Sequence, residues 1–426
     1  MKKWLSILFM VCVFCSVFSI QIFGASVTTL QYYDWQLTEE PAGTIIRQAI
    51  KDFEAENPNI KVNVLPVPTA QRSDKLATMI FGGQAPDISH VTEVDLARLV
   101  NMRALVGLDG YLAKTPDLSK QLIPSMVNMA KYKKKVYGIP RFASINTLMY
   151  NKQHFIDAGL DPNKPPVTWA EFLQYAKKLT RDTNNDGKID RWGFALLGAK
   201  TLSLPNRYLS WLWSTGGDIL NKSQNKCTLN SKGSIAAIKF YTDLSLVHHV
   251  TPPGPADFDY AAMTASFIQE KTSMMVDGPW ILGRITAENP SIKVGVGAMP
   301  SQTGKFIFMN GGGGFLTIAA QSKNREAAWK LIQFLSNAKN QWDYDTGASA
   351  LPTRLDLVER MQKSGSPIMG QFSDLCKYVR TAPQIPQMPQ IFSLFAEEVQ
   401  FVLIGQKSAE EAGQNLAKRV DELLNR

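Results

Sequence analysis

The chain of 426 residues has little cysteine, and half of what it has lies near the N-terminus. Cys12 and Cys15 fall inside an apolar stretch, so only Cys227 and Cys376 remain beyond it. Two cysteines cannot form the framework of a small disulfide-stapled domain. The sequence leaves open whether these two pair, because geometry restricts which cysteines can be bridged.

Sequence signatures of common catalytic sites are also missing. The chain has no G-x-S-x-G, no H-E-x-x-H and, beyond the apolar N-terminal stretch, no C-x-x-C. Of its four histidines only His248 and His249 are adjacent, and that spacing does not place both on one helix face. Acidic pairs such as Glu397 and Glu398 are typical of solvated helix faces. The sequence therefore favours a protein without turnover. An exported glycosidase is the alternative, because its carboxylate pair cannot be identified from sequence.

The N-terminus has the pattern of a secretory signal peptide over residues 1–26. Two lysines precede an apolar run from Trp4 to about Phe23, and small residues follow. An uncleaved anchor helix is the alternative, since the run approaches the roughly 20 residues of a membrane span. Neither cysteine in the run follows a lipoprotein processing box. We therefore expect a periplasmic or extracellular protein.

Charge gives no indication of a nucleic-acid partner. The formal charge of +9 includes Lys2 and Lys3, so the exported chain carries 9 − 2 = +7. Basic residues are scattered, and the longest basic run, KYKKK at 131–135, is typical of a solvated turn.

Helical and extended patterns alternate after the signal. Residues 27–35 are rich in β-forming types, residues 46–53 place apolar side chains on one helix face, and residues 60–64 alternate apolar and polar. A helical segment at 72–81 then leads to a strand at 88–91. The roughly 400 exported residues fit two domains or one two-lobed α/β protein.

The stretch DTNNDGKIDRWGF, residues 182–194, follows a helix capped by Thr168 and Glu171 and resembles a calcium loop. Its twelfth place holds Gly193 where an EF-hand has glutamate, and a strand-like run follows, which excludes an EF-hand sensor. A calcium site and a metal-free polar turn both remain open. The candidate ligands are Asp182, Asn184, Asp186, the Lys188 carbonyl and Asp190.

Two segments are candidates for chain crossings between lobes. RFASIN at 141–146 and MNGGGGF at 309–315 interrupt the surrounding patterns. Glycine there would allow unusual dihedral angles and hinge motion, and a plain glycine turn is the alternative.

Tryptophans in polar surroundings favour a carbohydrate site. Trp35, Trp211 and Trp280 lie in YYDWQ, RYLSWLW and DGPW. A flat indole can stack on the CH face of a sugar ring while neighbouring polar groups bind its hydroxyls. Each tryptophan taken alone is more often a core or surface packing residue, so the prediction rests on the group.

The order of several short segments resembles the family 1 extracellular solute-binding proteins of bacterial ABC transporters, the group that includes maltose-binding protein. The matching pieces are, in order, FEAENPNIKVNV, GGQAPDI, VYGIPRFASINTLMYNK, PPVTWAEFLQYAKKL, STGGDIL, FIQEKTSMMVDGPW, AAWKLIQFLS, ALPTR and IPQMPQIFSLF with SAEEA. They extend over the whole exported chain.

The resemblance implies the two-lobed α/β periplasmic binding protein fold (type II-like), with lobes joined by crossing hinge segments. The N-terminal lobe would take residues 27–143 and about 312–345, and the C-terminal lobe 144–311 and about 346–426. The protein would be a monomer that closes around an oligosaccharide and delivers it to the membrane permease of an ABC importer. No cofactor is required, and structural calcium is possible because some polyuronate-binding relatives carry such a loop. Arg191 at the tenth place, where they have an acidic ligand, departs from that pattern.

Aromatic surroundings and the resemblance together give a set of candidate ligand contacts. In chain order they are Trp35, Thr92, Glu93, Asp95, Arg141, Ser144, Tyr208, Trp211, Trp280, Gly312, Gly313, Arg354 and Phe392. Phe392 stands where relatives often have a stacking tryptophan. We expect a neutral or weakly charged oligosaccharide. A polyol phosphate or polyuronate is the alternative, which would need Arg141, Arg207 and Arg354 to converge.

Overall fold

The structure is a computed structural model that describes residues 27–305, 308–363 and 366–425. The predicted signal peptide lies outside these residues. Within the described ranges no helix is long and apolar enough to cross a membrane. Cys227 and Cys376 are free thiols.

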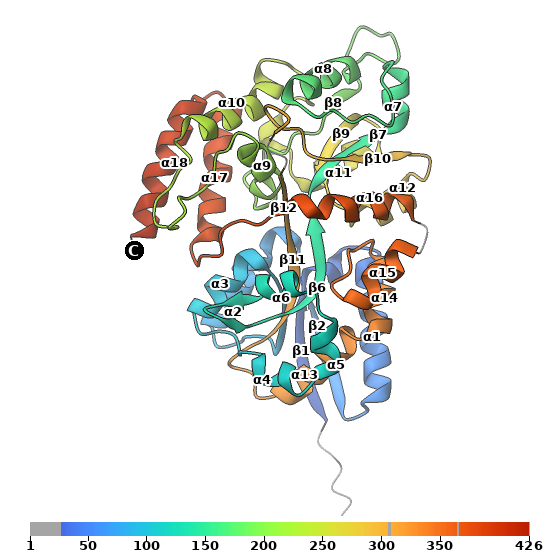
Figure 1. Cartoon of the computed structure of the whole chain (residues 1–426), viewed down its shortest axis with the longest axis vertical. Helices are drawn as coiled ribbons and strands as arrows, with labels where there is room; N and C mark the ends of the chain where they lie inside the picture. Colours follow the sequence, from blue (N-terminus) through green and yellow to red (C-terminus); the bar gives the residue numbers. More distant parts are fainter. Residues whose placement is uncertain (1–26, 306–307, 364–365, 426) are drawn as a thin grey trace, which may run out of the picture.

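A six-stranded mixed sheet organises the first lobe, in the lower half of Figure 1. The central strand β1 pairs in parallel with β2 and β3, β3 pairs antiparallel with β11, and β11 also pairs with β6 and β12. The strands are β1 (Thr28–Asp34), β2 (Ile60–Pro66), β3 (Ile88–Thr92), β6 (Ile139–Ile145), β11 (Met309–Ile318) and β12 (Val379–Arg380). The predicted β-α-β unit at 27–64 is thereby confirmed, with α1 (Ala42–Glu56) as its helix.

Helices cover both faces of this sheet, because side chains along a strand alternate between faces. Tyr32 of β1 and Leu316 of β11 enter one apolar cluster, whereas Tyr33 and Phe315, one position away in each strand, enter another. The remaining elements of the lobe are η1 (Trp35–Thr38), η2 (Thr69–Gln71), α2 (Arg72–Phe81), α3 (Glu93–Asn101), α4 (Asp109–Ala113), α5 (Pro116–Gln121), α6 (Pro124–Met129), β4 (Lys131–Tyr132), β5 (Lys135–Val136), α13 (Arg325–Leu335), α14 (Ala338–Gly347) and α15 (Leu355–Lys363).

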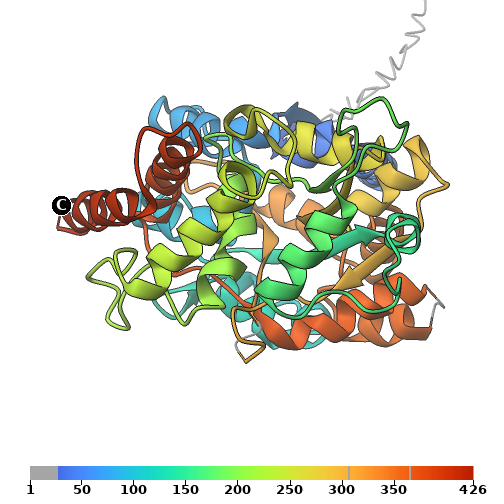
Figure 2. The ribbon, with the colours of Figure 1, turned by 90° about the horizontal axis from the view of Figure 1, so that it is seen from above.

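A four-stranded sheet in the order β10-β7-β9-β8 organises the second lobe. Its strands are β7 (Thr147–Asn151), β8 (Trp192–Phe194), β9 (Thr272–Asp277) and β10 (Val294–Gly297). Its helices are α7 (Lys152–Asp157), α8 (Trp169–Leu179), α9 (Ser203–Trp213), α10 (Lys232–Leu246), η3 (Pro255–Asp257), α11 (Tyr260–Ile268), α12 (Ile281–Glu288), α16 (Pro367–Leu375), η4 (Cys376–Tyr378), α17 (Met388–Leu403) and α18 (Ala409–Leu424). Figure 2 shows α17 and α18 along one side of the molecule, where α18 packs against α17 and α10.

The chain crosses between the lobes along β6 and β11, as predicted for residues 141–146 and 309–315. In Figure 1 both strands run from the first sheet toward the second lobe, and Asn146 separates β6 from β7 of the second sheet. The predicted boundaries between the lobes at 143/144 and 311/312 therefore both fall within these crossing strands. The exact lobe boundaries stay a prediction.

The glycines of β11 allow close packing, whereas the sequence predicted that they allow unusual dihedral angles. None of Gly311 to Gly314 has a positive φ, so they do not supply unusual dihedral angles. They lie instead in a buried strand, directly before a shift in its register with β6 at Gly314/Phe315, and neighbouring side chains press closely against it. A Cβ on Gly313 would lie 2.5 Å from the Met126 side chain, and one on Gly314 would lie 2.1 Å from His90 Nε2. Glycine is required here for close packing.

Candidate ligand-binding cleft

A cavity of about 640 Å³ lies between the lobes. Its first wall comes from η1, the starts of α1 and α2, the β3–α3 junction, β6 and the end of α14. Its second wall comes from α9, α11 and α12. The volume falls within the roughly 300–1,000 Å³ typical of small-molecule sites.

Trp35 lies on the first wall with its ring already in contact with other side chains. It stacks on His90 with 4.2 Å between ring centroids and 23° between planes, and the Arg72 guanidinium lies 5.2 Å from its centroid. Only 5% of Trp35 is exposed. In this conformation little of the indole is available to a ligand.

A buried polar group holds Trp35 in this position. Asp34 accepts hydrogen bonds from His90 Nδ1 at 2.9 Å, from the Tyr32 hydroxyl at 2.5 Å and from the backbone N–H of Gln36 at 2.8 Å. The last bond caps η1 at its N-terminus. Buried polar atoms that are satisfied in this way restrict movement of the cavity wall.

Glu93 and the crossing strand β11 meet at the same wall. The backbone N–H of Gly313 donates to Glu93 Oε2 at 3.0 Å, and a Cβ on Gly312 would lie 2.3 Å from the carboxylate. Burial raises the pKa of Glu93, while its hydrogen bond to Gly313 and the charge of Arg72 act in the opposite direction. Gly312 therefore contributes the space that Glu93 needs, and it does not itself line the cavity.

Helix α9 presents one polar face to the cavity. Ser203, Asn206 and Arg207 are spaced three and four residues apart and all line it. Arg207 donates to Asp277 Oδ1 at 2.8 Å, and its guanidinium lies 4.4 Å from the Tyr260 ring centroid. Burial raises the pKa of Asp277, while Arg207 opposes that shift.

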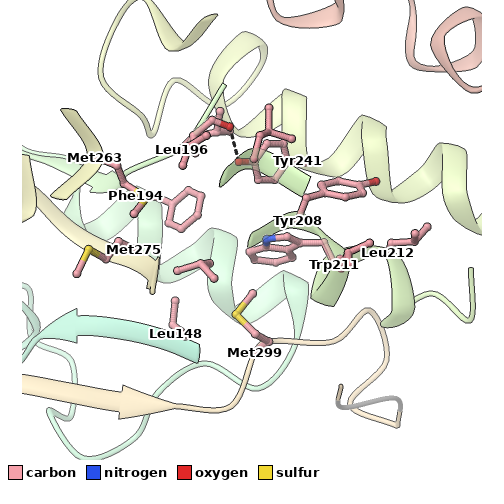
Figure 3. Close-up of a cluster of buried hydrophobic side chains, with 14 of the residues drawn as sticks. Leu148, Phe194, Leu196, Tyr208, Trp211, Leu212, Tyr241, Met263, Met275 and Met299 are labelled. Atoms are coloured by element: carbon pink, nitrogen blue, oxygen red, sulfur yellow. Dashed lines mark hydrogen bonds between the residues drawn. The ribbon is translucent and has the colours of Figure 1, made fainter. Parts of the chain in front are cut away.

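Tyr208 and Trp211 of the same helix enter the second-lobe core, which makes two predicted contacts wrong. Figure 3 shows Tyr208 and Trp211 among Leu148, Met275 and other apolar side chains. Trp211 is fully buried, and Tyr208 packs at 4.6 Å between ring centroids against Phe395. Neither side chain reaches the cavity.

Phe392 and Asp95 also lie away from the cavity. Phe392 is 1% exposed and belongs to the same core, so the predicted stacking at this position is wrong. Asp95 accepts from the Ser73 hydroxyl at 2.7 Å and pairs with Arg98 at 3.1 Å within the first lobe. Its carboxylate supports α2 and α3 instead of lining the cavity.

Arg141 and Arg354 are structural residues as well. Arg141 donates to the Leu335 carbonyl at 2.6 Å, and its guanidinium lies 4.0 Å from the Tyr344 ring centroid. Arg354 forms two hydrogen bonds, of 3.0 and 2.8 Å, to Asp356. Of the three arginines that could have formed an anion site, only Arg207 lines the cavity.

Trp280 lies on the second wall at the start of α12. Its Nε1 donates to the Tyr260 hydroxyl at 3.0 Å, and a Cβ on Gly278 would lie 2.1 Å from the indole, so glycine is required beneath the ring. Trp280 is half-buried. Gly283, Arg284, Ala287 and Glu288 follow it along the same helix face and also line the cavity.

Six of the predicted contacts therefore lie on the cavity walls. They are Trp35, Thr92, Glu93, Ser144, Trp280 and Gly313. Whether each touches a ligand stays a prediction. Sequence reasoning missed several other lining residues, among them Glu39, Arg72, Asn146, Tyr260, Arg284 and Tyr344.

Each arginine of the cavity already has a protein partner. Besides the Arg207–Asp277 pair, Arg284 donates to Glu288 Oε1 at 2.6 Å. The third, Arg72, donates to a backbone carbonyl at 2.9 Å. The lining holds four glutamates and three arginines, together with amide, hydroxyl and aromatic side chains. Such a surface can offer many hydrogen bonds and ring faces to a neutral polyhydroxylated molecule.

The loop at 182–190 keeps its shape through its own hydrogen bonds. Asp182 Oδ2 accepts from the Gly187 N–H at 2.7 Å, and Asp190 accepts from the Thr183 N–H and hydroxyl at 3.0 and 2.8 Å. Within the described ranges no cluster of three or more acidic, histidine or cysteine residues could hold a metal ion. Calcium binding by the five predicted ligands, which include an amide and a backbone carbonyl, stays a prediction.

Packing explains why this loop lacks a terminal glutamate. A Cβ on Gly193 would lie 2.2 Å from the Ala176 carbonyl oxygen of α8. Only glycine fits at that place. The local fold here depends on close contact between β8 and α8, and a bidentate glutamate cannot be added without moving one of them.

A two-lobed α/β molecule with a polar and aromatic cavity between its lobes has the architecture of a small-molecule-binding protein. The profile of the bacterial extracellular solute-binding proteins matches residues 38–342. The chain belongs to this family.

Individual relatives agree with the family. A binding protein of Brucella abortus (strain 2308) is 27% identical over 384 residues, which cover 90% of each chain. The multiple sugar-binding protein of Streptococcus mutans is 26% identical and covers 74% of this chain and 73% of its own. The crystal structure of an ABC transporter solute-binding protein from Thermotoga lettingae, bound with α-D-tagatose, has a TM-score of 0.85 and 29% identity, covering 93% of this chain and all of that one. The predicted two-lobed α/β fold is confirmed.

Proposed function

We propose that this protein binds a neutral saccharide outside the cytoplasm and delivers it to the permease of an ABC importer. The observation that carries the proposal is the cavity between the lobes, with Trp280 and Tyr260 on one wall and Glu93 and Trp35 on the other. The names of two similar proteins, one a multiple sugar-binding protein and one crystallised with α-D-tagatose, support a sugar as the ligand class.

Neutrality of the ligand follows from the charges of the cavity. An anionic ligand needs donors that are free to turn toward it, preferably paired N–H groups. Arg207 is held by Asp277, and Arg284 is held by Glu288. A phosphate or uronate at either of these two arginines would therefore displace an existing ion pair beside several carboxylates. A sugar hydroxyl can instead donate to the carboxylates and accept from the arginine N–H groups without displacing them.

Binding without turnover is the second part of the proposal. The family is one of binding proteins. The cavity residues that the structure describes include neither histidine nor cysteine, so the usual nucleophile and base pairs are not found on its walls. A pair of carboxylates could still act on a glycosidic bond, which is why the test must follow the saccharide as well as the protein.

Calorimetric titration against a panel of saccharides tests both parts. The panel contains D-tagatose, maltose and maltotriose, with glycerol 3-phosphate and a uronate disaccharide as anionic members. We expect at least one neutral sugar to bind and to be recovered unchanged by chromatography. Preferred binding of an anionic member contradicts the ligand class, and smaller products after incubation contradict binding without turnover.

A further inference from the structure

Helix α12 of the second lobe touches the start of α1 in the first lobe at a glycine. A Cβ built on Gly283 would lie 3.1 and 3.2 Å from Cδ and Cγ of Pro41, and 3.9 Å from the Gly347 carbonyl oxygen. Gly283 has no positive φ, so alanine could adopt its backbone conformation. What the position does not offer is room for a side chain.

The contact bridges the two lobes at the edge of the cavity. Pro41 directly precedes α1, which packs against β2 of the first sheet and against α14. Gly283 is the third residue of α12, which follows β9 of the second sheet and packs against α11. Both residues line the cavity. Since β6 and β11 join the lobes, opening about these strands would separate Gly283 from Pro41.

We propose that Gly283 is a closure residue, whose missing side chain lets α12 approach Pro41 and thereby sets how fully the cleft closes and how tightly the ligand is held. The inference rests on the proposed function, because it needs a ligand that stabilises the closed arrangement. A larger side chain at 283 would act as a spacer between the lobes without removing any group that binds the ligand.

The size of the effect follows from the distances. At 3.1 Å an alanine methyl requires Pro41 to move by a few tenths of an ångström, whereas the two methyls of valine demand a larger shift. Overpacking of this kind corresponds to roughly five-fold to 150-fold in an equilibrium constant. We expect Gly283→Ala near the lower limit and Gly283→Val above about ten-fold in Kd.

Gly370→Ala is the matched control. Gly370 also lies in a helix interior, that of α16, and a Cβ built there meets nothing within 4 Å. Alanine at both positions favours the helix by about 1 kcal/mol over glycine. The ligand-free melting temperature should therefore not fall in either alanine variant, while only the change at Gly283 should weaken binding.

The experiment measures Kd by calorimetry and the radius of gyration by X-ray scattering, with the tightest-binding sugar among D-tagatose, maltose and maltotriose. We expect Kd to rise in the order wild type, Gly283→Ala, Gly283→Val. The saturated Gly283→Val protein should stay less compact than saturated wild type, and Gly370→Ala should match wild type.

Four results would overturn the proposal. An unchanged Kd in Gly283→Val rules out a spacer effect. Weaker binding with full compaction at saturation means that the side chain obstructs the ligand and not closure. A lower ligand-free melting temperature in Gly283→Ala means that the Pro41 contact is permanent. If the wild type binds none of the three sugars, the proposed function fails, and the closure proposal fails with it.

Discussion

Replacing Trp280 with alanine should weaken saccharide binding by roughly thirty-fold. The indole is half-buried on the second wall, lies against Gly278 and donates to the Tyr260 hydroxyl at 3.0 Å. Loss of a ring stacked on a sugar costs about 0.5–1.5 kcal/mol beyond the apolar area it covers. Loss of the hydrogen bond that orients Tyr260 adds about 1 kcal/mol. Together they give about 2 kcal/mol, and 1.4 kcal/mol corresponds to a factor of ten in Kd.

Two further variants separate the contributions. Trp280→Phe keeps an aromatic face and loses only the N–H donor, so its Kd should rise by about five-fold, the equivalent of one hydrogen bond. Trp211→Phe alters a fully buried ring in the second-lobe core, so it should lower the melting temperature and leave Kd unchanged. Calorimetry and thermal melting on the same samples report both quantities.

The reasoning about Trp280 fails under either of two results. Trp280→Ala with a Kd within two-fold of wild type would mean that the ring does not contact the ligand. A Trp211→Phe protein that loses as much affinity as Trp280→Ala would mean that Trp211 contributes to the binding site and has been wrongly placed in the core.

Three other expectations concern stability. Gly193→Ala should destabilise the fold by about 3 kcal/mol or more in urea titration, because its Cβ would lie 2.2 Å from the Ala176 carbonyl oxygen, and near-wild-type stability would contradict that contact. Adding calcium to metal-free protein should leave the melting temperature unchanged, because the 182–190 loop is held by its own hydrogen bonds. A calcium-dependent rise in melting temperature that Asp182→Ala abolishes would establish the calcium site instead. Burial, aided by the charge of Arg191, lowers the pKa of His154 to about 4, so the folded protein favours the neutral ring. The free energy of unfolding should therefore decrease as pH falls from about 6.5 toward 4, by at most about 1.4 kcal/mol per pH unit. A His154→Gln protein with the same pH dependence between these values would show that other groups are responsible.

Local sequence signals predicted the elements well. The capping box at Thr168 forms as expected and begins α8. The alternation of apolar and polar residues at 60–64 gives β2. Each of these features depends on side chains within a few residues of one another, so the information is present in a short window.

The cavity walls depend on information that a short window does not contain. In RYLSWLW the aromatic residues were predicted to contact the ligand. In the structure Tyr208 and Trp211 lie in the core, and Arg207 lines the cavity. Residues all around α9 are buried, so the pattern of polar and apolar residues does not show which of them pack in the core and which line the cavity. That choice is made when the second lobe packs against the crossing strands.

Trp280 was predicted from its polar surroundings in DGPW and from the family resemblance, and it does line the cavity. The lining residues that follow it on α12, Gly283, Arg284 and Ala287, were not predicted. Arg141 was misplaced because a buried arginine that stacks on Tyr344 has the same sequence appearance as one that binds a ligand. Only the tertiary contacts distinguish the two.

X-ray scattering during a saccharide titration tests the central claim most directly. If the cavity holds a neutral sugar between two lobes that close around it, the radius of gyration falls as the sugar is added, with a midpoint equal to the calorimetric Kd, and Trp280→Ala shifts that midpoint upward. A radius that stays constant while calorimetry reports saturation would contradict closure around the ligand.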